Sequence, residues 1–226
     1  MKKLVVAIDG PAASGKSTTA RILAERLGYI YVDTGAMYRA MTLKVLQHRL
    51  DLDDVAGITA LALNTEIRLG REGTRLKILL DGADVTAAIR KPAVTNAVSA
   101  VSALPPVREL MVREQRRLGR EGGVVLEGRD IGTVVFPDAD VKIYMVADVS
   151  QRARRRKKDL QQQGIEIEVD QIRKEILDRD RKDSQRDHSP LKQASDAITI
   201  DTSELTIDQQ VDQILHHIQN VLHMEA

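Results

Sequence analysis

The sequence has no cysteine. It also has few aromatic residues, with no tryptophan, one phenylalanine and four tyrosines. Without cysteine, disulfide bonds and thiolate metal sites are excluded, and this composition suits a reducing compartment such as the cytoplasm. Because binding of single-stranded nucleic acid usually depends on aromatic stacking platforms, the scarcity of aromatic residues argues against that function. We therefore expect a cytoplasmic protein whose partners include no nucleic-acid polymer.

Long apolar runs are also absent. The first apolar stretch, residues 4–8, ends at Asp9 and is too short for the apolar region of a secretory signal. No segment approaches the roughly 20 apolar residues of a membrane span, so we expect no membrane association. The charges are also balanced, because the chain has 34 Lys and Arg residues and 33 Asp and Glu residues, for a net charge of +1. This balance gives no overall attraction to nucleic acid or to membranes.

The most informative feature that is present follows the first apolar run directly. It is the pattern G-x-x-x-x-G-K-S, formed by Gly10, Pro11, Ala12, Ala13, Ser14, Gly15, Lys16 and Ser17. Between a strand and a helix, the backbone N–H groups of such a loop surround a polyphosphate at the positive end of the helix. The lysine then reaches the β- and γ-phosphates, and the Ser17 hydroxyl binds Mg²⁺. We predict a nucleotide-phosphate site here, rather than a glycine-rich turn with a solvated lysine.

Strand-like runs alternate with helical patterns along the chain, which predicts a parallel sheet with helices on both faces. A helix is expected over residues 15–27. A last helix is expected after a capping-box pattern at 206–209, because apolar residues then recur at helical spacing. The strand-like runs are residues 4–8, 29–32, 124–126, 141–146 and 197–200.

One region breaks this alternation. Residues 65–69 and 77–80 read as short strands around a turn at 70–74, which predicts a small antiparallel hairpin. A helix is expected to follow at 92–104. We therefore assign residues 1–35 and 104–226 to a core, and residues 36–103 to an insertion.

Polar segments follow three of the predicted strands, at the edge where an open α/β sheet binds its ligands. The phosphate loop follows the first strand. The second is followed by residues 33–39 (D-T-G-A-M-Y-R), and the run at 124–126 by residues 127–130 (E-G-R-D). An acidic residue in such a place is more often a helix cap, but the three segments together favour one ligand crevice.

Two arginine-rich segments lie in the second half of the chain. Residues 151–158 (Q-R-A-R-R-R-K-K) form either a solvated basic helix face or a nucleic-acid patch. In the second segment, offsets of four and seven residues put Arg179, Asp183 and Arg186 on one helix face. That face is either a surface ion-pair ladder or two phosphate clamps with a carboxylate that accepts a sugar hydroxyl. The spacing alone leaves both readings open.

The phosphate loop does not distinguish hydrolysis from phosphoryl transfer. No asparagine is followed by lysine, so the N-K-x-D guanine motif of GTPases is absent, and a motor or transporter ATPase would usually be larger. A compact chain with an inserted substrate module and many arginines suits a small-molecule kinase, because catalysis there is mostly positioning and charge neutralisation.

Six motifs in these segments are similar to those of the bacterial-type cytidylate kinases, from one end of the chain to the other. They lie at residues 8–18, 33–39, 96–99 (N-A-V-S), 107–109 (V-R-E), 127–139 and 179–186. The resemblance implies an α/β, three-layer phosphate-loop kinase fold with a parallel sheet. It also implies an inserted monophosphate-binding module containing a small antiparallel sheet, and a short helical lid at about 151–165.

The activity that this resemblance implies is transfer of the γ-phosphoryl group of ATP to CMP or dCMP, with Mg²⁺, by a cytoplasmic monomer. Residues 10–18, which end at Thr18, would hold the ATP phosphates, and Ser17 would bind the metal. The catalytic candidates are all cationic: Lys16, Arg129, Arg155, Arg156 and Arg186, with Arg152 as a further candidate in the lid.

The same resemblance implies an acceptor site. Its residues would be Thr34, Tyr38, Arg39, Ser99, Arg108, Arg129, Asp130, Arg179, Asp183 and Arg186. Arg39 and Arg129 would bind the CMP phosphate, and Arg186 would bridge phosphates. Asp183 and Arg179 would bind the ribose side. The cytosine edge would be read by Ser99, Arg108 and Asp130, and Asp130 would reject UMP by placing an acceptor against an acceptor.

Two alternatives stay open from the sequence. The acceptor could be UMP, AMP or shikimate, which would make the chain another small-molecule kinase. The chain could also be a nucleotide-dependent RNA-binding regulator that uses the basic run at 151–158, although the near-zero net charge and the few aromatic residues count against that reading.

Overall fold

A computed structural model of the chain describes residues 3–72, 75–162 and 164–224. The chain divides into two compact units. We call them the core unit (Met1–Tyr31 and Gly119–Ala226) and the inserted unit (Val32–Leu118). The inserted unit begins within the second strand of the chain, and it ends one residue before the end of a helix.

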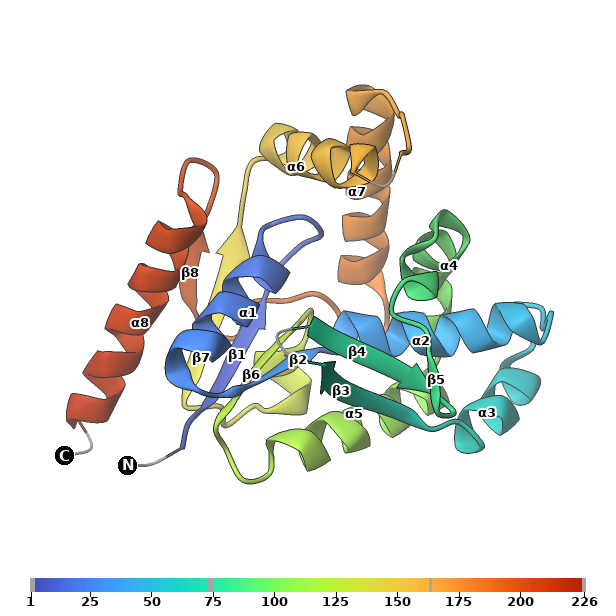
Figure 1. The fold of residues 1–226 in the computed structure, drawn as a ribbon, viewed down its shortest axis with the longest axis horizontal. Helices are drawn as coiled ribbons and strands as arrows, with labels where there is room; N and C mark the ends of the chain where they lie inside the picture. Colours follow the sequence, from blue (N-terminus) through green and yellow to red (C-terminus); the bar gives the residue numbers. More distant parts are fainter. Residues whose placement is uncertain (1–2, 73–74, 163, 225–226) are drawn as a thin grey trace. The chain divides into compact units, whose positions relative to one another are not determined.

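The core unit is built on a parallel sheet with the strand order β2-β6-β1-β7-β8 (Figure 1). β1 is central, because Val6 pairs in register with both Val125 of β6 and Val141 of β7. All five predicted strands form, and the expected parallel sheet is confirmed. Their bounds are β1 (Val5–Asp9), β2 (Ile30–Asp33), β6 (Val124–Gly128), β7 (Val141–Val146) and β8 (Ile198–Asp201).

Helices α1 (Lys16–Leu27) and α8 (Ile207–Met224) pack against one face of this sheet. α8 begins after the predicted capping box, which is confirmed. The Thr206 amide donates to Gln209 Oε1 at 2.9 Å, and the Gln209 amide donates to Thr206 Oγ1 at 3.3 Å. Alternate strand residues and the apolar stripes of the two helices make one buried core: Val6, Ile8, Ile143, Met145, Ala20, Leu23, Val211, Ile214 and Ile218.

Two further helices of the core unit, α6 (Val149–Gln161) and α7 (Val169–Gln185), lie side by side (Figure 1). Ala153 and Leu160 of α6 pack against Ile172 and Ile176 of α7. The Asp148 carboxylate caps α6 by accepting from the Ser150 amide at 2.8 Å. The predicted lid segment therefore begins in α6, which shares a small apolar core with α7. A one-turn π-helix, η2 (Ile131–Val135), follows β6.

The inserted unit contains a small antiparallel sheet, ordered β3-β4-β5, together with several helices. The predicted hairpin is confirmed, but its strands continue into the expected turn, since Gly70 pairs with Lys77 and Glu72 with Arg75. Residues 73 and 74 of that turn lie outside the described residues. The elements are α2 (Thr34–Gln47), α3 (Val55–Leu63), β3 (Ile67–Glu72), β4 (Arg75–Leu80), β5 (Ala83–Asp84), the 3₁₀-helix η1 (Ala88–Arg90), α4 (Pro92–Ala103) and α5 (Pro105–Gly119).

The inserted unit is wider than the insertion that the sequence suggested, residues 36–103, because it also holds the end of β2 and nearly all of α5. Two apolar residues of α5, Val107 and Met111, are buried. Across the described ranges, no helix is both long and apolar enough to span a membrane.

Candidate active site

The phosphate loop connects β1 to α1 and has an unusual backbone. Gly10 and Gly15 have φ angles of +148° and +98°, and Ala13 has a φ of +58°. A Cβ atom at Gly10 would lie 2.1 Å from the carbonyl oxygen of Met145, so glycine is required where the loop leaves β1. Gly15 is the N-cap of α1, so this helix begins within one residue of the predicted start.

Lys16 is buried at the start of α1 and points back into the loop. Its Nζ donates to the carbonyl oxygen of Pro11 at 2.6 Å and to Ser14 Oγ at 3.3 Å. Burial and the nearby Arg129 guanidinium lower the pKa of Lys16 below its usual value, although Glu127 and Asp9 oppose the shift. A bound polyphosphate would add negative charge beside this buried cation.

Asp9, the last residue of β1, is a second buried ionisable group beside the loop. Its carboxylate accepts from the backbone amides of Ile131 and Gly132 at 2.9 and 2.8 Å. Burial raises the pKa of Asp9 to about 6, although these two hydrogen bonds and Lys16 act in the other direction. Sequence reasoning assigned no role to Asp9, although it lies at the end of a predicted strand and within the motif at residues 8–18.

Side chains from distant parts of the core unit hold the backbone of the loop. Thr202, which follows β8, donates from Oγ1 to the carbonyl oxygen of Ser14 at 2.8 Å. At the first turn of α1, Thr19 Oγ1 donates to Oε1 of the buried Gln210 at 2.7 Å. Sequence reasoning missed Thr202 and Gln210, because no local pattern marks a polar residue that is buried by tertiary packing.

Ser17 and Thr18 lie in the first turn of α1, and both are exposed. In the described part of the chain no group of three or more His, Asp or Glu side chains could hold a metal ion. A hydroxyl oxygen suits Mg²⁺, which usually takes few protein ligands and completes its shell with water and substrate phosphates. The exposed Ser17 therefore fits the predicted metal contact.

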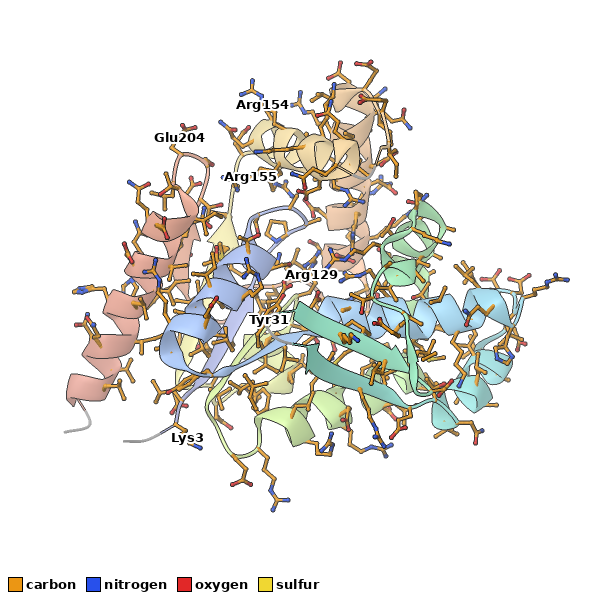
Figure 2. The ribbon with its side chains drawn as sticks, viewed as in Figure 1. Lys3, Tyr31, Arg129, Arg154, Arg155 and Glu204 are labelled. Atoms are coloured by element: carbon orange, nitrogen blue, oxygen red, sulfur yellow. The ribbon has the colours of Figure 1, made fainter. Side chains whose placement is uncertain are left out.

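A cluster of charged residues connects β6 with the end of α7, and Figure 2 labels Arg129 within it. Arg129 Nε donates to Asp183 Oδ2 at 2.9 Å, and Arg179 Nε lies 4.0 Å from the same oxygen. Although burial opposes it, the neighbouring Arg129 and Arg179 guanidiniums lower the pKa of Asp183. Because Asp183 is buried, this cluster is not the exposed ion-pair ladder that the spacing left open.

Arg186 also belongs to this cluster, but it does not lie on the helix face that was predicted for it. α7 ends at Gln185, and Arg186 has an extended backbone with ψ near 143°, so the expectation that it shares a helix face with Arg179 is wrong. The chain folds back instead, and the Leu191 amide donates to the carbonyl oxygen of Asp183 at 2.8 Å. This turn leaves Arg186 Nη2 at 3.7 Å from Asp130 Oδ1.

The remaining acceptor candidates lie in the inserted unit. Asp33 caps α2 by accepting from the Ala36 amide at 2.7 Å, and its other oxygen lies 3.0 Å from Arg39 Nη2. Tyr38 and Arg108 meet in a cation–π contact, with 5.4 Å between the guanidinium carbon and the ring centre. Thr34 is buried as the first residue of α2, and Ser99 is half-buried on α4. That these residues and the core-unit cluster bind one ligand stays a prediction.

The three candidate lid arginines on α6 differ in their contacts. Arg155 donates from Nη1 to Thr202 Oγ1 at 3.1 Å and from Nη2 to the carbonyl oxygen of Thr202. Arg152 is buried and donates to backbone carbonyls of the phosphate loop and of residue 147. Arg156 is half-buried and makes no hydrogen bond within the described residues. Figure 2 shows that Arg154, which is exposed, points outward from α6.

A groove of about 570 Å³ lies elsewhere, between β3 and helices α3 and α5 of the inserted unit. Its walls combine apolar side chains such as Leu69 and Met111 with Glu114 and Arg117, which pair with each other at 2.5 Å. It contains none of the predicted site residues, so the phosphate loop, and not this groove, defines the candidate site.

The parallel sheet, the glycine loop with its buried lysine and the arginine-rich helices define a phosphate-loop kinase fold. A shikimate kinase from Bacteroides thetaiotaomicron has a similar fold, with a TM-score of 0.50 and 13% sequence identity over 97% of this chain and 98% of its own.

The chain belongs to the cytidylate kinase family, whose family model matches residues 6–220. A cytidylate kinase from Bacillus pumilus is 53% identical over 214 residues, which cover 95% of each chain. One from Enterococcus faecalis is 51% identical over 222 residues, covering 98% of this chain and 96% of the relative. The expected family is thereby confirmed.

Proposed function

We propose that the protein is a cytidylate kinase that transfers the γ-phosphoryl group of ATP to CMP, with dCMP as a second acceptor. The observation that carries this proposal is the family match over nearly the whole chain, together with a phosphate loop that holds a buried lysine. We further propose that it acts as a monomer and that it works in the cytoplasm. A reducing compartment suits a chain without cysteine.

ATP would bind with its phosphates in the loop of residues 10–18. Among the described residues Lys16 Nζ bonds only to loop oxygens, and it would exchange them for the β- and γ-phosphates. Mg²⁺, held by the Ser17 hydroxyl and the phosphates, would supply positive charge that offsets the negative charge on the transferred group. The loop amides add further donors at the N-terminus of α1.

On the acceptor side, Arg39 and Arg129 would bind the CMP phosphate, and Arg186 would bridge the acceptor and ATP phosphates. Asp183 and Arg179 would bind the ribose. Asp130 would accept from the exocyclic amine of cytosine, with Ser99 and Arg108 donating to the ring acceptors. Thr34 and Tyr38 would complete the surroundings of the nucleotide.

The chemical step needs charge neutralisation more than proton transfer. A phosphate monoester has a second pKa of about 6, so the acceptor oxygen is largely anionic at pH 7 and needs no general base. Lys16 and the arginines would neutralise the phosphoryl group as it moves. Closure of the lid, in which helix α6 carries Arg152, Arg155 and Arg156, would exclude water and limit ATP hydrolysis.

ADP release in the presence of CMP, dCMP, UMP, AMP and shikimate tests this assignment. We expect CMP and dCMP to be the best acceptors. A preference for UMP, AMP or shikimate would contradict the cytidylate assignment and support a different small-molecule kinase. RNA affinity that falls steeply with salt, without acceptor-dependent ADP release, would support the regulator instead.

A further inference from the structure

Asp180 on α7 contacts the phosphate loop, although the proposed function gives it no role. Its Oδ1 accepts from the backbone amide of Ala12 at 3.2 Å, and its Oδ2 pairs with Nη1 of Arg152. The Asp180 side chain is 17% exposed and that of Arg152 is 8% exposed. This pair is therefore mostly removed from water, unlike the exposed ion pairs that contribute little.

The guanidinium of Arg152 is fixed by three acceptors. Nε donates to the carbonyl oxygen of Ala147 at 3.1 Å, just after β7. Nη1 donates to the carbonyl oxygen of Ala12 at 3.2 Å, in addition to Asp180. Both backbone polar groups of Ala12 are thus held by this pair. A planar guanidinium bound at Nε and Nη1 has its plane, and hence the direction of Nη2, determined.

Nη2 of Arg152 makes no hydrogen bond with any residue that the structure describes, and it is not among the buried nitrogens that lack a partner. It remains accessible beside the phosphate loop. Arg155 differs, because both of its Nη atoms already donate to Thr202. Of these two lid arginines, only Arg152 combines a fixed orientation with an unused terminal nitrogen.

We propose that Asp180 is a positioning residue, which fixes Arg152 on the phosphate loop so that Nη2 can donate to the phosphates of ATP. The inference deepens the proposed kinase function and rests on it for its kinetic test. The contacts of Asp180 are with Ala12 and Arg152, and it is given no contact of its own with the phosphates. A carboxylate near the phosphates would repel them, so its effect depends on the arginine that it holds.

A double-mutant cycle tests this dependence, with kcat and the KM for ATP and for CMP measured on Asp180→Asn, Arg152→Ala and the double variant. Each single variant should lower kcat by about 10- to 100-fold, because small misplacements of a charge-stabilising group have effects of that size. In the Arg152→Ala background, Asp180→Asn should add less than about twofold. The KM for CMP should change little in all three.

Asp178→Asn is the matched control, since Asp178 lies on the same helix and pairs with Arg181 and Lys182 at the surface. It should leave kcat unchanged. Asp180→Glu keeps the charge but moves the carboxylate by one methylene, and it should also lower kcat if orientation matters. Equal losses in Asp178→Asn, wild-type kcat in Asp180→Glu, or multiplicative losses in the cycle would overturn the proposal.

Calorimetric titration with ATP on the same variants separates this inference from the proposed function. If the wild-type protein shows no CMP-dependent turnover, the proposed function fails, but the cycle can still be evaluated in Kd for ATP. We expect Asp180→Asn to weaken ATP binding at least threefold, and to do so only when Arg152 is present. Tighter ATP binding by Asp180→Asn would mean that the carboxylate competes with the nucleotide for the Ala12 amide, and would overturn the proposal.

Discussion

A side chain at Gly10 should disrupt both the fold and the phosphate site. A Cβ atom there would lie 2.1 Å from the carbonyl oxygen of Met145, well inside the 3.0 Å that real Cβ contacts essentially never cross. The obstacle is the backbone of β7, so it cannot rotate away. Gly10→Ala must therefore shift the loop from β7 or change a backbone conformation, at φ +148°, that suits glycine.

Gly28 provides the matched control for the size of this effect. It also has a positive φ, +66°, as the C-cap of α1, but a Cβ atom there would have no neighbour within 4 Å. Gly28→Ala should therefore cost only the left-handed conformation of an alanine, about 1–2 kcal/mol. Gly10→Ala adds overpacking of about 1–3 kcal/mol, for a total of about 2–5 kcal/mol.

Urea titrations of both variants measure the free energy of unfolding, and calorimetry measures ATP affinity. We expect Gly10→Ala to be the less stable variant and to lose ATP binding, because the loop amides move. Gly28→Ala should bind ATP like the wild type, since Gly28 lies at the far end of α1. Equal stability losses, or normal ATP binding by Gly10→Ala, would refute the reasoning.

Two further predictions concern the carboxylates of the site. Asp130→Ala should reduce the ratio of kcat/KM for CMP over UMP more than it changes the KM for ATP, and an unchanged ratio would remove Asp130 from base recognition. Burial raises the pKa of Asp9 from 3.8 to about 6, so the folded state binds an extra proton in that interval and the free energy of unfolding falls as the pH rises through it. Between pH 4 and pH 7, urea titration should show the wild type losing about 2 kcal/mol relative to Asp9→Asn; a constant difference would contradict the shift.

The sequence predicted the parts of the fold that local chemistry determines. Continuous apolar runs such as residues 124–126 became strands, since a sheet with covered faces buries both sides of each strand. The glycine loop was predicted because its backbone angles require glycine at Gly10 and Gly15. The capping box at 206–209 formed because its hydrogen bonds are local.

Parts that depend on tertiary contacts were harder to predict. Composition assigned residues 70–72 to a turn, but pairing with β4 keeps them in a strand. Residues 131–135 (I-G-T-V-V) form a π-helix, whose first two amides donate to the buried Asp9. Helical spacing could not show that α7 ends before Arg186.

The supports of the phosphate loop illustrate the same limit. Asp180 is far from Ala12 in the sequence, and so is Thr202 from Ser14, yet each pair is joined by a hydrogen bond. Only the folded arrangement of β8, α6 and α7 brings these residues to the loop. Asp180 lies within the arginine-rich segment at 179–186, but nothing in that pattern indicates which carboxylate faces the loop.

Transfer of a labelled γ-phosphoryl group from ATP to CMP, followed by separation of the nucleotides, tests the central claim most directly. The wild-type protein should produce labelled CDP. Lys16→Ala should produce none while keeping the wild-type circular dichroism spectrum, because within the described parts of the chain Nζ bonds only to Pro11 and Ser14 of the loop. A folded wild-type protein that leaves CMP unlabelled, or a Lys16→Ala variant that labels CMP at the wild-type rate, would contradict the account.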